Sequence, residues 1–249
     1  AALATAIGQW VAMILALVIN AKINRELSIS FRGFRPDLRV IREIYAIGVP
    51  SIIMQAITSV MTVGMNKILG NDVAISVFGV YFKLQSFIFM PIFGLTNAVI
   101  PIVAYNYGAR KKQRITDVSR FALFITVVVM AAGTLIFHLN TKTLLGFFNA
   151  DAAMIEIGIP ALRIISIAFC LSGVSIVCAS VFQALGHAFW SMIVSMVRQL
   201  VVILPAAYIL MHFWGMPAVW FSLPFAELVA MLLSIFLYFK ICKKTLNQL

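Results

Sequence analysis

Four ionisable side chains stand within long apolar stretches of the sequence: Lys83, Arg163, Arg198 and Glu227. A charge at such a position is costly, so each is a functional hypothesis by default. Groups of this kind can hold a charged part of a solute or pass a proton. Seven amides stand in the same stretches: Gln55, Asn66, Gln85, Asn97, Asn106, Gln183 and Gln199. The candidates for a substrate cavity are Lys83, Arg163, Gln55, Asn66, Asn97 and Gln183, and the candidates for an ion pair or proton site are Arg198 and Glu227.

Motifs for catalysis and nucleotide binding are absent from the sequence. It contains no HExxH, no Asp-rich diphosphate motif, no GxSxG elbow and no glycine-rich phosphate loop. His138, His187 and His212 stand singly, without partners at metal-ligand spacing. We therefore expect a protein that is not an enzyme, binds no ATP, and needs no metal or cofactor.

The composition excludes a soluble domain. Of the 249 residues, 63% are hydrophobic and 11% are charged, and the net charge is +11. A soluble protein has about 45–50% apolar and about 25% charged residues, so the excess must face lipid. The cations lie in short gaps between apolar runs rather than on a polar face, which argues against nucleic acid as a partner.

The apolar runs are long enough to cross a bilayer as helices, which takes about 20 residues each. They are continuous rather than alternating, so a membrane β-barrel is excluded. Seven spans are predicted: Ala1–Ile19, Gly48–Leu69, Ala74–Tyr107, Phe121–Phe137, Ile155–Leu185, Phe189–Phe213 and Ala218–Phe239. Prolines inside the spans, such as Pro160 and Pro205, are expected to open the helix locally.

The basic residues gather in alternate gaps between the spans. Fourteen of the nineteen Lys and Arg residues lie on one side: Lys22, Arg25, Arg32, Arg35, Arg39, Arg42, Arg110, Lys111, Lys112, Arg114, Arg120, Lys240, Lys243 and Lys244. Cytoplasmic loops carry this excess, so the C-terminus is predicted to be cytoplasmic and the N-terminus external. An external start without a signal segment favours the second part of a longer membrane protein; the alternative is a seven-helix protein with trimmed first residues.

Depth in the membrane groups the four charges into two pairs. At about 1.5 Å per residue, Lys83 and Arg163 lie roughly 12 Å below the outer surface. They could share a cavity and hold an anionic group, reach a partner elsewhere, or extend to the lipid headgroups. From the cytoplasmic side, Arg198 is about 13 Å and Glu227 about 18 Å deep on consecutive antiparallel spans. These two could form a structural ion pair, or Glu227 could exchange protons.

Four segments resemble one family of transporters. The run MPIFGLTNAVIPIVAYNYGARKKQR (90–114) is similar to the second helix and basic loop of a lobe in the multidrug and toxic compound extrusion family. VFQALGHAFWSMIVSMVRQLVVILP (181–205) resembles a later junction, IGVPSIIMQAITSV (47–60) the opening of the second lobe, and ATAIGQW (4–10) the end of the first.

The resemblance implies an all-α, polytopic membrane helix bundle. Residues 1–20 would be the last helix of a missing N-terminal lobe, 21–45 a cytoplasmic linker, 46–240 a six-helix lobe of a twelve-helix transporter, and 241–249 a cytoplasmic tail. Within the linker, PDLRVIREI (36–44) reads as an amphipathic interfacial helix or as the cytoplasmic end of the next span.

The same resemblance implies efflux of amphipathic, cationic drugs or metabolites by H+ or Na+ antiport through alternating access. The protein would lie in the plasma (inner) membrane, with the lipid bilayer, a small-molecule substrate and its own N-terminal lobe as partners. The family's main ion site is on the first helix, outside this chain. Where some members have carboxylates, the lobe offers Gln55 and Thr58, or Glu156 at the outer mouth.

The four intramembrane charges sum to +2, which repels a cationic drug. Export of an anionic or lipid-linked molecule therefore remains an alternative, and a non-transporting membrane scaffold is a third.

Overall fold

The computed structural model describes residues 2–23 and 36–242. Contacts divide the chain into two compact units, Ala1–Tyr45 and Ala46–Leu249, and each is considered by itself. Part of the predicted linker and tail, with Arg25, Arg32, Arg35, Lys243 and Lys244, lies outside the described residues.

The first unit contains α1 (Ala2–Ile23) and the beginning of α2 (Leu38–Leu69). The side chains of α1 are almost all exposed, as expected of a helix whose apolar surface needs a covering. The Asp37 carboxylate accepts a hydrogen bond from the Arg39 N–H at 2.8 Å. From Leu38 on, the predicted linker segment belongs to the same continuous helix as the second span, which ends at Leu69. Its place at the membrane surface stays a prediction.

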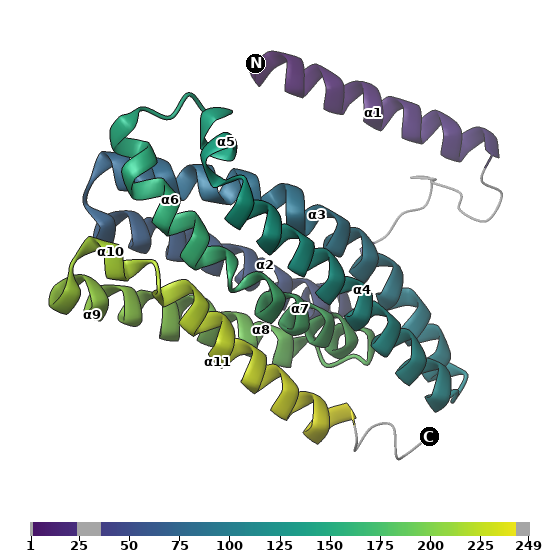
Figure 1. The fold of residues 1–249 in the computed structure, drawn as a ribbon. Helices are drawn as coiled ribbons and strands as arrows, with labels where there is room; N and C mark the ends of the chain where they lie inside the picture. The colour runs from purple at the N-terminus through teal and green to yellow at the C-terminus, as the bar shows by residue number, and fades with distance from the viewer. Residues whose placement is uncertain (1, 24–35, 243–249) are drawn as a thin grey trace. The chain divides into compact units, whose positions relative to one another are not determined.

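The second unit is a bundle of helices joined by short turns (Figure 1). After α2 come α3 (Asp72–Gly108), α4 (Lys112–Leu139), α5 (Thr141–Gly146), α6 (Ala152–Ser166), α7 (Phe169–Ala184), α8 (Ala188–Met196), the π-helix η1 (Val197–Ile203), α9 (Leu204–Trp214), α10 (Met216–Val219), α11 (Ser222–Leu237) and η2 (Tyr238–Cys242). Six helices of the described chain are long and apolar enough to span a membrane, and the bent pair α6–α7 makes a seventh. The predicted all-α bundle is confirmed.

The predicted fifth span is not one straight helix. It bends by 46° between α6 and α7, at Ile167 and Ala168, seven residues beyond Pro160. The two N–H groups at the bend donate to carbonyls three residues earlier instead of four. The Ser166 carbonyl accepts a hydrogen bond from the Thr134 hydroxyl of α4 at 2.9 Å. A side chain on another helix thus satisfies a carbonyl at the bend.

The predicted sixth span also changes its character midway. Residues Val197–Ile203 form a π-helix, which ends two residues before Pro205. Pro205 has no N–H and its ring crowds the carbonyl four residues earlier, which favours a departure from the α-helical pattern in the preceding turns. Arg198 lies in this π-helix, one residue after its start.

The ends of the second unit differ in charge. In Figure 1 the turns α2–α3, α5–α6 and α9–α10 lie at one end, and the turns α3–α4 and α7–α8 lie at the other with the end of α11. The first end carries Asp72, Lys142 and Asp151, whereas the second carries Arg110, Lys111, Lys112, Arg114 and Lys240. The helices therefore alternate in direction, and most cations of the described turns lie at the second end.

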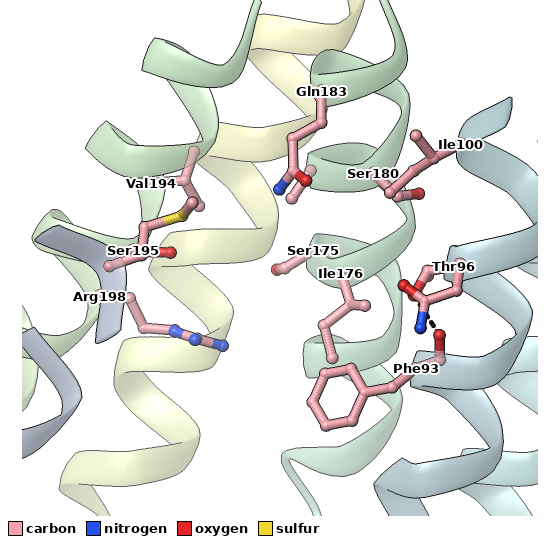
Figure 2. Close-up of a pocket in the computed structure, with 13 residues that line it drawn as sticks. Phe93, Thr96, Ile100, Ser175, Ile176, Ser180, Gln183, Val194, Ser195 and Arg198 are labelled. Carbon is pink, nitrogen blue, oxygen red and sulfur yellow. Dashed lines mark hydrogen bonds between the residues drawn. The ribbon is translucent and has the colours of Figure 1, made fainter. Parts of the chain in front are cut away.

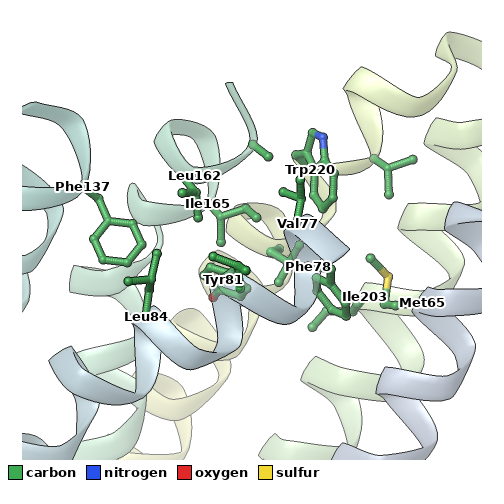
Figure 3. Packing of buried hydrophobic residues seen from close by; sticks show 14 of the residues in the cluster. Met65, Val77, Phe78, Tyr81, Leu84, Phe137, Leu162, Ile165, Ile203 and Trp220 are labelled. Carbon is green, nitrogen blue, oxygen red and sulfur yellow. The ribbon is translucent and has the colours of Figure 1, made fainter. Parts of the chain in front are cut away.

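Buried side chains form two clusters along the bundle. The larger surrounds Phe78, Phe169 and Trp220, all at most 1% exposed, and joins α2, α3, α6 and α11 (Figure 3). The Phe169 ring meets that of Phe137 edge to face at 5.0 Å. The smaller cluster, which includes Val103 and Phe182, lies towards the cationic end. These clusters fix the helices that line the interior cavities.

Candidate functional site

An ion pair joins the π-helix to the last long helix. Nη1 of Arg198, on η1, lies 3.1 Å from Oε1 and 3.4 Å from Oε2 of Glu227, on α11. The two side chains are 22% and 14% exposed. Depth along the spans placed these residues within reach of each other, and the structure brings them together. Whether Glu227 also exchanges protons remains a prediction.

Two cavities meet at this ion pair. The first has a volume of about 250 Å³ and lies between α2, α3, α7, α8 and η1 (Figure 2). The second, of about 220 Å³, lies towards α11 and includes Glu227. Phe93, Ile176 and Arg198 line both. Either cavity alone is smaller than a drug-sized site of roughly 300–1,000 Å³, whereas the two joined reach the lower part of that range.

The first cavity is lined by polar groups from four elements. They are Thr96 and Asn97 of α3, Ser175, Ser180 and Gln183 of α7, Ser195 of α8 and Arg198 of η1. The hydroxyls of Thr96, Ser175 and Ser180 donate to carbonyls of their own helices, so their lone pairs remain as acceptors. The side chains of Asn97, Gln183 and Ser195 have no hydrogen-bonding partner among the described residues. The cavity can therefore both donate and accept.

The second cavity combines the ion pair with amides and aromatic rings. Gln85 and Gln199 line it beside Tyr81, Phe82 and Phe89. Gln199 is buried at 6% exposure, one residue after Arg198 on the π-helix. An amphipathic solute would meet apolar surface and a few convergent polar groups here, as is typical of ligand sites.

The other predicted site residues lie elsewhere. Gln55, Lys83 and Arg163 are exposed and Asn66 is half-buried, and none of them lines either cavity. The Lys83 ammonium stands 5.7 Å from the centroid of the Phe148 ring. The shared cavity predicted for Lys83 and Arg163 is therefore not one of these two and stays a prediction. Of the predicted substrate residues, the structure places Asn97 and Gln183 in one cavity.

Sequence reasoning missed the serines and threonine of the first cavity. A usable signal was present in α7, where Ile176, Ala179, Ser180 and Gln183 follow the i, i+3, i+4, i+7 spacing of one helix face. Small and polar residues along such a face leave room for a cavity.

Among the described residues no three His, Cys, Asp or Glu side chains gather to hold a metal ion. The ring of His138 lies 3.2 Å from the Ser166 hydroxyl.

A family comparison decides what kind of protein carries these cavities. Residues 47–209 match the MatE family model. The chain belongs to the MatE family. The resemblance seen in the sequence is thereby confirmed, and the protein is an integral, multi-pass membrane protein.

Curated relatives of this MatE chain are named as export proteins. Multidrug export protein MepA of Staphylococcus saprophyticus is 26% identical over 241 residues, which cover 96% of this chain and 53% of that protein. MepA of Staphylococcus aureus (strain NCTC 8325) is 26% identical over 229 residues, or 91% of this chain and 50% of that protein. The expectation of a transporter rather than an enzyme agrees with these names. The chain spans about half the length of these relatives.

Solved structures share the fold. A MOP superfamily transporter from Pyrococcus furiosus, described as having a binding pocket of reverse polarity, gives a TM-score of 0.84 at 22% identity over 95% of this chain and 54% of its own. An outward-facing multidrug resistance MATE family transporter gives 0.84 at 22% identity, over 96% and 55%. These likenesses establish the fold alone.

Proposed function

We propose that the protein exports amphipathic organic solutes by H+ or Na+ antiport through alternating access. The observation that carries the proposal is the pair of cavities that meet at Arg198 within the membrane-spanning part of the bundle. A cavity with polar lining at membrane depth costs stability and is expected where a solute passes. The names of the curated relatives support the same activity.

The coupling ion is proposed to bind mainly in the other half of the protein. Among the described carboxylates, Glu227 is the one that lines either cavity, and Arg198 already engages both of its oxygens. A carboxylate held in this way is a poor ligand for a second cation, because the neighbouring guanidinium charge repels that cation. An N-terminal lobe of the kind that the resemblance to the family implies is the proposed place for the ion site.

The protein is further proposed to lie in the plasma (inner) membrane with a cytoplasmic C-terminus. The end of the bundle that carries Lys111, Lys112 and Lys240 would face the cytoplasm, in keeping with the positive-inside rule. Those cations would then meet anionic lipid.

Efflux from proteoliposomes tests the proposal. The full-length protein is reconstituted with an entrapped fluorescent amphipathic dye, and a pH gradient or a Na+ gradient is imposed separately. Release should accelerate with one gradient and fall to the protein-free rate when an ionophore for that ion collapses it. Release that is equal with and without either gradient contradicts antiport.

Export of an anionic or lipid-linked molecule is the second candidate. One observation favours it: the charged residue common to both cavities is a cation, Arg198. In the efflux assay, cationic and anionic dyes of the same skeleton separate the two candidates.

A further inference from the structure

We propose that the first cavity binds the carboxylate group of an organic solute and that Arg198 is the residue that holds it. The inference rests on the proposed function in one respect, since the bound solute is taken to be the exported one. It adds the chemical class of the ligand and the side chains that recognise it.

The first cavity presents a single charged group, a cation that is paired with a carboxylate outside the lining of this cavity. Arg198 is the single charged residue among those that line it, whereas Glu227 lines only the second cavity. Glu227 accepts hydrogen bonds from Nη1 of Arg198 alone. A guanidinium carries five N–H donors in a planar fork that matches a carboxylate. The donors on Nη2 and Nε have no partner among the described residues, so Arg198 can bind a second carboxylate without releasing the first.

Neutral donors surround the same space. Asn97, Gln183 and Ser195 line the cavity from three different helices and have no other hydrogen-bonding partner within the described chain. In Figure 2 Arg198 and Ser195 project from one side of the cavity, and Gln183 and Ser175 from the other. A carboxylate next to Arg198 would therefore meet amide and hydroxyl donors from several directions, as a small anion requires.

The remaining lining suits the apolar part of such a solute. Met54, Phe93, Ile100 and Ile176 line the first cavity, and Phe93 and Ile176 continue into the second. An ammonium headgroup finds no carboxylate among the residues that line the first cavity, whereas a carboxylate finds the guanidinium of Arg198 there. The pattern of one cation, neutral donors and apolar walls thus selects an amphipathic carboxylate over an amine of equal size.

Binding of three probes with one skeleton tests this inference. They are 4-phenylbutyrate, 4-phenylbutanol and 4-phenylbutylamine, measured by calorimetry on the full-length protein in neutral detergent without any ion gradient. The wild type should bind the carboxylate most tightly. The double variant R198Q/E227Q removes the guanidinium without leaving an unpaired charge, and should weaken carboxylate binding by about tenfold or more while the alcohol is unaffected.

A single variant gives an effect of opposite sign. E227Q removes a negative charge 3.1 Å from Arg198 that repels an incoming carboxylate, so binding of 4-phenylbutyrate should tighten. A purely structural ion pair would not produce tighter binding in one variant and weaker binding in the other. K111Q is the matched control, because it removes one cation from the turn between α3 and α4, away from both cavities, and should leave all three affinities unchanged.

Three results would overturn the inference. They are equal carboxylate binding by wild type and R198Q/E227Q, a preference for the amine, and competition by phosphatidylglycerol that shows a lipid phosphate in the site instead. Failure of the proposed function has a different signature. Efflux that ignores ion gradients while carboxylate binding still depends on Arg198 refutes antiport and leaves the cavity assignment in place.

Discussion

The ion pair between Arg198 and Glu227 predicts a pattern of stabilities that a surface pair would not give. Removing one partner of a fully buried pair costs about 3–5 kcal/mol, because the other charge is left uncompensated. Here the two side chains are 22% and 14% exposed to solvent, so we expect a single substitution to lower the free energy of unfolding by about 2–3 kcal/mol. For a chain of this size that is a fall of about 5–10 °C in Tm.

Both single substitutions should lower Tm. Arg198→Met leaves the Glu227 carboxylate without its partner, and Glu227→Gln leaves the Arg198 guanidinium without its partner. The double variant Arg198→Met/Glu227→Gln should be close to the wild type, since neutral groups of similar volume replace the pair.

The assay is heating of the full-length protein in detergent, followed by size-exclusion chromatography of the fraction that stays soluble and monodisperse. The two single variants and the double variant together form a double-mutant cycle, and its coupling free energy measures the interaction between Arg198 and Glu227. If the double variant loses as much as the two singles added together, the residues do not interact energetically. If neither single variant lowers Tm, the pair contributes nothing and the reasoning is refuted.

Two further predictions concern the helices around the site and the orientation of the chain. Thr126→Val should leave Tm unchanged or raise it, because the buried Thr126 hydroxyl has no hydrogen-bonding partner. Thr134→Val should lower the free energy of unfolding by about 0.5–1.5 kcal/mol, because the hydrogen bond to the Ser166 carbonyl is lost. Equal effects of these two substitutions would contradict the role given to Thr134. A reporter that is active only in the cytoplasm should be active when fused after Leu249, and activity solely of a periplasm-specific reporter would reverse the proposed orientation.

The sequence alone determined the membrane architecture. Apolar runs such as 121–137 have one stable solution in lipid, because a helix satisfies its own backbone hydrogen bonds. Local composition is then enough to predict the element. Depth arithmetic also placed Arg198 and Glu227 within reach, since consecutive antiparallel helices with short turns leave little freedom in register.

Only the tertiary structure decided where the spans bend and what they enclose. At the bend, the Ser166 carbonyl accepts a hydrogen bond from the Thr134 hydroxyl of another helix, a contact that no local pattern reveals. Lys83 and Gln183 looked alike in the sequence, yet Lys83 lines neither of the two cavities and Gln183 lines one. In a helix that is apolar on every side, polarity does not fix which face turns inward, so the rotation of each helix is set by the packing of its neighbours.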